Sequence, residues 1–323
     1  MHRLVLLGLL AVLTIQSRAW SAEKSTFSTE RLEDRVLIKY RKQPLATYMF
    51  KSDVIKRPFF MDVFAPDGTR LTRQWPPKKG EDPVDHADQH GGIWLAFGDI
   101  SGVDFWRNKG EVRQVSLTLG RPEQAGLRFS ASNEFRSPTG ELMCRQTTQY
   151  MFGECSQGVL LDWTSVIEPV GEPIVFGDQE EMGLGVRLAT PLTVTQGGDI
   201  VNAHGHRDER GVWGKQAAWC EYRKQVESTD VGIAIFTSPK NFRQCWFHVR
   251  DYGLMVANPF GRNAFTKQAP SQVVVKRDRP LQLRFGILLS ATKSRRTDVI
   301  AAYKRFLDLE KNEAAHANAP ALR

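Results

Sequence analysis

The chain has 323 residues and a formal net charge of +8, with 44 Lys and Arg against 36 Asp and Glu. Its hydrophobic content of 41% is enough for a sizeable core, which excludes a disordered, collagen-like or coiled-coil chain. The charges are interspersed, without a long basic run or a nucleic-acid-binding motif, so we expect no nucleic-acid partner and a modest preference for anionic ones.

The N-terminal segment has the pattern of an export signal. Arg3 precedes an apolar run over residues 4–15, and small residues follow near the expected cleavage point. The run is too short to span a bilayer as a mature helix, and no later stretch is long enough. We therefore expect a signal peptide at 1–21 and a secreted or periplasmic mature chain at 22–323 without a membrane span. The alternative is an uncleaved anchor.

The next segments predict strands and one long loop. Short runs at 35–40, 46–50 and 59–64 are rich in β-branched and aromatic residues, as strands are. Residues 75–90 (WPPKKGEDPVDHADQH) are instead rich in proline and charge, which predicts a loop. A loop of this length in a compact domain tends to be functional or disordered.

A regular meander follows, and then a single helix. Residues 111–168 form long segments, many with alternating polar and apolar positions, separated by turn clusters, which predicts consecutive antiparallel strands. Further strand candidates continue to residue 291, for a total of about sixteen by pattern matching. Residues 297–311 have one apolar face at helical spacing. The fold class predicted is all-β, a large antiparallel β-sandwich with one C-terminal helix; a two-domain split near 170–175 is the alternative.

The stretch DHADQHGGIW (85–94) crowds Asp85, His86 and His90 in front of a buried segment. Two histidines four residues apart would align on a helix, but the neighbouring prolines and Gly-Gly argue against one. A turn would still bring both rings together with Asp85, as an acid/base pair or as metal ligands. The alternative is a solvated loop.

Two later segments carry further candidates. FGDQEEMGLG (176–185) places Asp178, Glu180 and Glu181 beside a glycine-rich segment, where a carboxylate would serve as a general base or end a charged hairpin. FHVRDYG (247–253) contributes His248, Arg250 and Asp251, and the first two share one face of a strand. Internal ion pairs are the structural alternative.

Three other residue groups lead to weaker expectations. The HGH at 204–206 offers two imidazoles, but its surroundings favour an exposed turn over a metal site. The eight tryptophans, Trp213 among them, suit the apolar faces of sugar rings, although core packing explains most of them. Four cysteines show no metal-like spacing; they are free thiols or include one disulfide, for which Cys220–Cys245 is the first choice.

Several segments together resemble the exported bacterial family labelled "methane oxygenase PmoA-like", whose function is largely unassigned. The matching segments are RPFF (57–60), DHADQHGGIW (85–94), GDISGVDFW (98–106), FGDQEEMGLGVRLA (176–189), WGKQAAW (213–219), HVRDYG (248–253) and NPFG (258–261). The family pattern at the second of these reads DHPHH-x-G-hydrophobic-W, of which this chain keeps Asp85, one or two histidines and Gly-Ile-Trp. The resemblance implies a galactose-mutarotase-like supersandwich with the loops at 75–94, 176–185, 202–215 and 248–261 on its concave face.

We expect this face to bind or process a carbohydrate. His86, His90 or His248 would act as the acid, and Glu181 or Asp178 as the base. His86, His90, Glu181 and His248 are therefore predicted to converge on one pocket. The residues expected to contact substrate are Arg57, Arg73, Asp85, Asp178, Trp213, Lys215, Arg250, Asp251 and Asn258.

Two other classes of function stay open from the sequence. One is a metal-dependent oxygenase that uses His86, His90 and a carboxylate to hold Cu, Fe or Zn. The other is a non-catalytic envelope protein whose polar clusters are structural. The sequence requires no cofactor, and it does not fix the substrate, the reaction or the oligomeric state.

Overall fold

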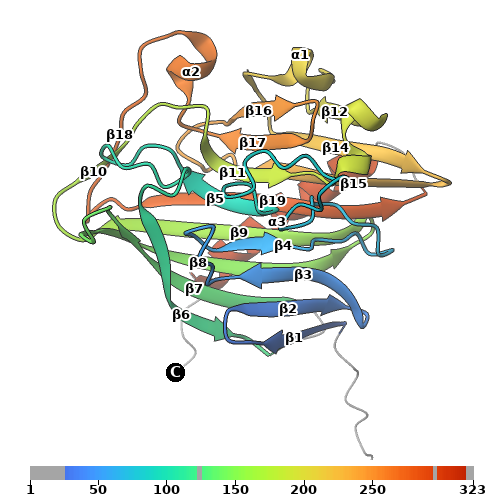
Figure 1. The fold of residues 1–323 in the computed structure, drawn as a ribbon, viewed down its shortest axis with the longest axis horizontal. Helices are drawn as coiled ribbons and strands as arrows, with labels where there is room; N and C mark the ends of the chain where they lie inside the picture. The colour runs from blue at the N-terminus through green and yellow to red at the C-terminus, as the bar shows by residue number, and fades with distance from the viewer. Residues whose placement is uncertain (1–25, 122–125, 294–296, 318–323) are drawn as a thin grey trace, which may run out of the picture.

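Two antiparallel β-sheets pack face to face in the computed structural model, which describes residues 26–121, 126–293 and 297–317 (Figure 1). In spatial order the first sheet contains β1 (Phe27–Arg31), β2 (Arg35–Tyr40), β3 (Gln43–Met49), β4 (Phe59–Met61), β5 (Ile93–Phe97), β11 (Met182–Arg187), β17 (Leu254–Asn258), β16 (Trp246–Arg250) and β13 (Lys215–Gln216). The second contains β12 (Asp199–Asn202), β14 (Trp219–Val226), β15 (Thr229–Thr237), β19 (Leu281–Thr292), β9 (Gly158–Pro169), β8 (Leu142–Cys155), β7 (Leu127–Arg136) and β6 (Glu111–Leu119).

The remaining elements are short, apart from one helix. A two-stranded sheet pairs β10 (Ile174–Phe176) with β18 (Val273–Val275). The helices are α1 (Asp208–Val212), α2 (Arg262–Thr266) and α3 (Thr297–Ala317), with two 3₁₀ turns, η1 (Thr190–Leu192) and η2 (Val194–Gln196).

The core lies between the two sheets because side chains alternate along each strand. In β5, Ile93, Leu95 and Phe97 point into this core, whereas Trp94 and Ala96 belong to a separate apolar cluster on the outer face of the first sheet. The outer face of the first sheet is therefore a second packed surface. Long loops, including the one between β4 and β5, pack against this surface.

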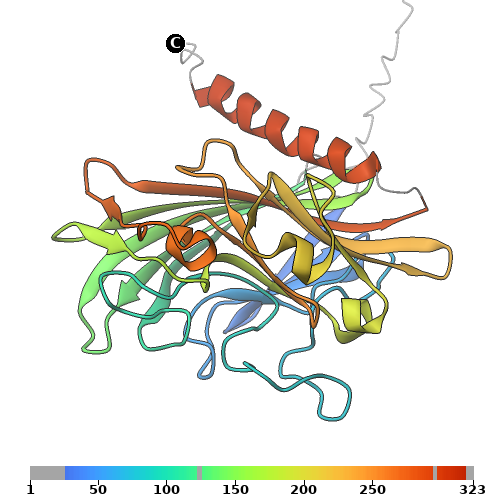
Figure 2. The same cartoon turned by 90° about the horizontal axis from the view of Figure 1, so that it is seen from above.

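Helix α3 covers the outer face of the second sheet. Its Val299, Ala302 and Phe306 pack in one cluster with Phe236 of β15 and Leu288 of β19. Full burial of an apolar side chain of this size stabilises the fold by about 1.5–3 kcal/mol. Figure 2 shows α3 on one side of the sandwich and the segment between β4 and β5 on the opposite side, so the two outer faces have different coverings.

The predicted fold class is confirmed, and the predicted meander is confirmed for the described part of 111–168, which forms β6 to β9. The predicted helix at 297–311 is α3, which continues to Ala317. The structure has more strands than expected and also contains α1 and α2, whose five residues each are too few for a periodic signal. Within the described residues, no helix is both long and apolar enough to cross a membrane. The predicted signal peptide at 1–21 lies outside them.

The disulfide chosen from the sequence is not formed. All four cysteines are free thiols, and three of them are buried. Cys220 lies on β14 of the second sheet, whereas Cys245 directly precedes β16 of the first sheet. Burial raises the pKa of both thiols, which keeps them protonated and apolar in character.

Candidate functional site

A polar cavity of about 160 Å³ lies over β16 and β17 on the outer face of the first sheet. Its lining consists of His86, Gln89, His90, Trp106, Arg107, Glu180, Glu181, His248, Arg250, Tyr252 and Leu254. The four residues predicted to converge, His86, His90, Glu181 and His248, all line it. Their placement in one cavity is therefore as expected, whereas their catalytic roles stay predictions.

Strand alternation explains how β16 contributes to the cavity. Phe247 and Val249 point into the core between the sheets, so His248 and Arg250 point outward. Tyr252 of the following turn and Leu254 at the start of β17 also line the cavity and complete this wall. The shared face of His248 and Arg250 that the sequence predicted is thus present.

A tight turn brings His86 and His90 together without a helix. The backbone N–H of His90 donates to the carbonyl of His86 at 2.8 Å, and His86 itself adopts a left-handed conformation with φ of +50°. Gly92 follows with φ of +136°, and a Cβ there would lie 2.1 Å from the carbonyl oxygen of Phe60. The Gly-Gly of this motif is therefore required where the loop joins β5 against β4.

The two imidazoles form a stack in the cavity lining. The His86 and His90 rings lie 5.0 Å apart at 22°, and His90 stacks in turn on Trp94 at 4.8 Å and 9°. Ring nitrogens hold a metal through lone pairs in the ring plane, about 2.0–2.1 Å away. Two nearly parallel rings at this spacing do not direct their lone pairs at one ion, so this pair does not fit the expected metal site. Among the described residues, no group of three or more His, Cys, Asp or Glu is placed to hold a metal.

Burial keeps His90 neutral. Desolvation and the neighbouring charges of His86 and Arg187 lower the pKa of His90 to about 2. Its Nδ1 is buried without a hydrogen-bond partner. His90 thus acts as an aromatic layer between His86 and Trp94, which differs from the expected acid.

His248 and Glu180 form the closest histidine–carboxylate contact on the β16 side. The Nε2 of His248 lies 3.6 Å from Oε2 of Glu180, and its Nδ1 lies 3.4 Å from the Glu180 carbonyl oxygen. Burial, with help from the charge of Arg250, lowers the pKa of His248 to about 4. Burial also raises the pKa of Glu180, although Arg250 opposes this change. Both groups are therefore shifted towards their neutral forms.

Ion pairs fix the other charged residues of the wall. Glu181 pairs with Arg107 at 3.0 Å. Arg250 donates to Glu180 at 3.4 Å and to Glu209 of α1 at 3.0 Å. Asp251 does not line the cavity; its carboxylate accepts the backbone N–H of Glu209 at 2.8 Å, which ties α1 to the end of β16.

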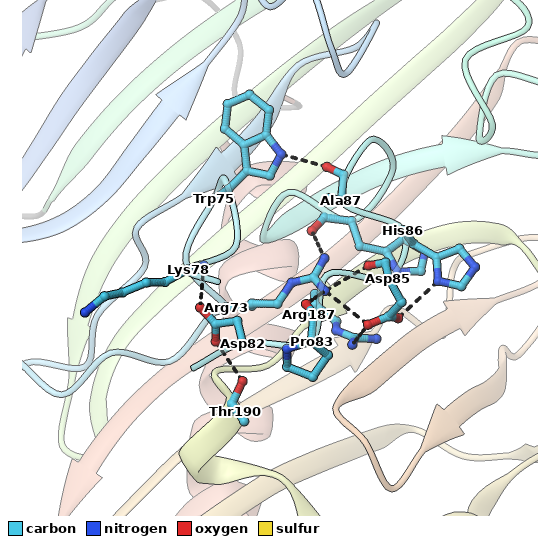
Figure 3. A network of polar contacts seen from close by, with 11 residues as sticks. Arg73, Trp75, Lys78, Asp82, Pro83, Asp85, His86, Ala87, Arg187 and Thr190 are labelled. Atoms are coloured by element: carbon cyan, nitrogen blue, oxygen red, sulfur yellow. Dashed lines mark hydrogen bonds and ion pairs between the residues drawn. The ribbon is translucent and has the colours of Figure 1, made fainter. Parts of the chain in front are cut away.

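On the opposite side, Asp85 joins two buried arginines to His86, as Figure 3 shows. Asp85 accepts a hydrogen bond from Arg187 at 2.8 Å, a longer one from Arg73 at 3.4 Å, and contacts Nδ1 of His86 at 3.1 Å. Burial alone raises the pKa of Asp85, but the hydrogen bond with His86 and the charges of Arg187 and Arg73 outweigh it and lower the pKa. Asp85 is therefore ionised at neutral pH.

Several expected substrate contacts lie away from the cavity lining. Arg57 is buried and donates to the carbonyl oxygens of Trp106 at 2.9 Å and of Gln89, so it ties loops together. Arg73 donates to the carbonyl oxygens of Pro83 at 2.7 Å and Asp85 at 2.9 Å, which shapes the loop in Figure 3. Neither side chain lines the cavity.

Asp178 and Asn258 hold the backbone of neighbouring segments. The Asp178 carboxylate accepts three backbone N–H groups, from Asn263, Ala264 and Ser271, at 2.6–3.0 Å. Asn258 donates to the carbonyl oxygens of Gln179 and Glu180 at 2.7 and 3.1 Å. Their functional groups are thus engaged, and Asp178 in particular is not placed to act as a base in the cavity.

Trp213 and Lys215 also lie outside the lining. Trp213 packs edge-on against Phe265 at 5.4 Å and lies under the guanidinium of Arg250 at 5.8 Å, so it supports the wall from behind. Lys215 is exposed on β13. The HGH segment forms an exposed turn, where the side chain of Asn202 accepts the backbone N–H groups of His204 and His206.

The cavity contains residues that the sequence reasoning missed. They are Gln89, Arg107, Tyr252 and Leu254. Each lies within or next to a segment already singled out, so the sequence predicted which segments form the cavity but not every residue that lines it. Arg187 was also missed. Burying an arginine without a partner costs free energy, so its presence inside the buried run GLGVRL indicates a partner elsewhere in the chain.

The fold and the site together define a class: an antiparallel β-sandwich protein with a partly open histidine–carboxylate cavity on one outer face. The sequence matches the model of the "Family of unknown function (DUF6807)" over residues 35–304, so the chain belongs to that family. No curated protein sequence matches it. The resemblance to the "methane oxygenase PmoA-like" family is tested by neither finding and stays a prediction.

Solved structures similar to this chain include three carbohydrate-related proteins. GH36 α-galactosidase AgaA from Geobacillus stearothermophilus is 11% identical, with a TM-score of 0.37 over 82% of this chain and 40% of that chain. A galactose mutarotase-like protein from Lactobacillus casei ATCC 334 is 7% identical, with a TM-score of 0.36 over 82% of this chain and 100% of that one. For 4-α-glucanotransferase from Thermococcus litoralis the identity is 9%, the TM-score 0.33, and the coverage 82% and 39%. We draw no conclusion about activity or ligand from these similarities.

Proposed function

We propose that the protein binds a carbohydrate in this cavity and processes it by acid–base chemistry. The observation that supports this most is the contact of 3.6 Å between Nε2 of His248 and Oε2 of Glu180, two groups that line the same cavity and are both shifted towards neutrality. Titratable groups whose pKa values are shifted by burial and by a charged neighbour are common in catalytic sites, where they give or take a proton during the reaction.

The lining suits a sugar ring. Tyr252 offers an aromatic face, while Arg107, Arg250 and Gln89 supply hydrogen-bond donors for hydroxyl groups. At about 160 Å³ the cavity is smaller than the ~300–1,000 Å³ typical of pockets for drug-sized ligands. It therefore fits one sugar unit better than an enclosed oligosaccharide.

Different residues of the cavity accept and donate the proton. Neutral His248 and the Glu180 carboxylate form the proton-accepting side, where a proton taken from a sugar hydroxyl is shared between them. His86 forms the donating side: as an imidazolium it directs Nδ1–H to Asp85 at 3.1 Å and gives the proton on Nε2 to the sugar, which leaves a neutral imidazole. Glu181 is instead paired with Arg107 and serves to position it.

Saturation-transfer NMR with a panel of neutral and acidic monosaccharides tests binding. Tyr252→Ala is expected to weaken binding of the sugar that the wild type prefers by at least tenfold, because its ring lines the cavity. Phe242→Ala is the matched control: Phe242 is 40% exposed, against 38% for Tyr252, but lies outside the lining. Absence of binding by any sugar, or equal loss in both variants, would contradict the proposal.

The alternative functions have less support. The stacked His86 and His90 do not fit the oxygenase that used them as ligands. A non-catalytic envelope protein would bind sugar without transferring protons, or bind none, and the same experiments identify it. Export to the periplasm or the medium is part of the proposal and rests on residues 1–21 alone.

A further inference from the structure

Arg187 is a buried cation with too few partners. Its side chain is 1% exposed, and Nη2 donates a hydrogen bond to Asp85 at 2.8 Å. Nε and Nη1 are both buried without a hydrogen-bond partner among the described residues. Leaving donors of a charged group unpaired costs more than leaving a neutral donor unpaired, so this arrangement is explained if an acceptor joins it.

The charge around Arg187 is also unbalanced. Arg73 is equally buried and is bound to the same carboxylate, so two guanidinium groups share one partly exposed Asp85. Burial and the charge of Arg187 together lower the pKa of Arg73 to about 10, a sign that the two cations repel each other. One more negative group at this position would balance the cluster.

The cluster adjoins the cavity described above. Tyr252, which lines that cavity, lies over the Arg187 guanidinium at 4.5 Å, and His86, also in the lining, contacts Asp85 (Figure 3). The side chain of Asp85 is 37% exposed and Tyr252 is 38% exposed, so both have room to turn aside. Arg187 itself does not line the cavity, and a ligand there reaches it once Tyr252 turns aside.

We infer that the ligand is an acidic sugar, a uronic acid, whose carboxylate binds Arg187 at the Asp85 side of the cavity. The inference rests on the proposed carbohydrate function and adds the class of sugar. A carboxylate is favoured because the guanidinium already binds one, that of Asp85, and planar carboxylates match its donor geometry. The incoming carboxylate joins Asp85 on Arg187 through the unpaired Nε and Nη1, and the two carboxylates compete for the same cation.

Isothermal titration calorimetry of the full chain at low ionic strength tests this inference. It compares the affinities for D-galacturonic and D-glucuronic acid with those for D-galactose and D-glucose. The uronic acids are expected to bind at least tenfold more tightly than the neutral sugars, with a preference that falls as salt is added. Arg187→Gln is expected to reduce the affinity for the uronic acids to that for their neutral counterparts. The affinity for the neutral sugars is expected to stay unchanged.

Asp85→Asn provides a test that does not depend on removing a buried arginine. It removes the competing charge, so it is expected to tighten uronic-acid binding severalfold relative to neutral-sugar binding. If this variant weakens uronic-acid binding, or if the wild type binds neutral sugars as tightly, the inference is wrong and the carbohydrate function stands. If D-glucose 6-phosphate binds more tightly than the uronic acids, the group recognised is a phosphate and the carboxylate assignment is wrong. If no sugar of any class binds, both the inference and the proposed function fail.

Discussion

The burial of His90 predicts a specific loss of stability in acid. In the folded protein the pKa of His90 is lowered to about 2, whereas the unfolded chain has the ordinary value of 6.5. Below pH 6.5 the unfolded chain therefore binds more protons than the folded protein. The stabilising contribution is complete above pH 6.5 and is lost progressively as the pH falls towards 2.

The size of this effect follows from the linkage between protonation and folding. For one histidine that stays neutral when folded, lowering the pH from 7.5 to 5.0 reduces the free energy of unfolding by about 2 kcal/mol. His248 is shifted in the same direction, to a pKa of about 4, and adds a similar loss over this range. Replacing His90 with Phe keeps a flat ring between His86 and Trp94 but removes the titrating group.

His90→Phe is therefore expected to lessen the stability difference between pH 7.5 and 5.0 by about 2 kcal/mol. Urea unfolding followed by far-UV circular dichroism measures it at both pH values. His204→Phe is the matched control, since it replaces a histidine that is exposed in the folded protein. An unchanged pH dependence in His90→Phe would refute the reasoning, because His90 would then titrate alike in both states.

Two further substitutions test the packing on either side of the sandwich. Asp162→Asn is expected to destabilise the fold by about 1.5–3 kcal/mol, because it removes the carboxylate charge at Nε of buried Arg284 at 2.9 Å, while the pair of Arg284 with Glu310 at 3.4 Å remains. Unfolding in guanidinium chloride at pH 7.5 measures the change, and a loss below 1 kcal/mol contradicts it. Gly185→Ala places a Cβ 2.6 Å from the Trp94 ring and is expected to cost about 1–3 kcal/mol. Its control is Gly171→Ala, which meets nothing within 4 Å, and equal unfolding midpoints for the two variants contradict the packing described.

Local sequence patterns predicted the sheets well because each strand has its own alternation of polar and apolar residues. The strands of the meander and the long C-terminal helix required no knowledge of distant residues. Helices α1 and α2 were missed because they are single short turns whose ends are fixed from elsewhere. The carboxylate of Asp178, for example, accepts the N–H groups of Asn263 and Ala264 at the start of α2, across more than 80 residues.

The candidate site was predictable as a set of segments but not as a set of contacts. The sequence placed Glu180 and Glu181 side by side, and nothing local decides which of them meets His248. That choice depends on Asn258, which binds the carbonyl oxygens of Gln179 and Glu180 and orients the turn. The pairing of Asp85 with Arg187, 102 residues away, is likewise a product of the sheet order and not of any motif.

The central claim is that the cavity transfers protons to and from a bound sugar. Interconversion of the two anomers of a reducing sugar needs only one acid and one base, so it is the most direct measurement. Exchange NMR is expected to show that the wild type accelerates this reaction for the sugar it binds, and that Glu180→Gln slows it by about 10²–10⁴-fold with sugar binding retained. Glu168→Gln, at an exposed position on β9, is expected to match the wild type. Equal rates for the wild type and Glu180→Gln, or no acceleration by the wild type, would contradict the claim.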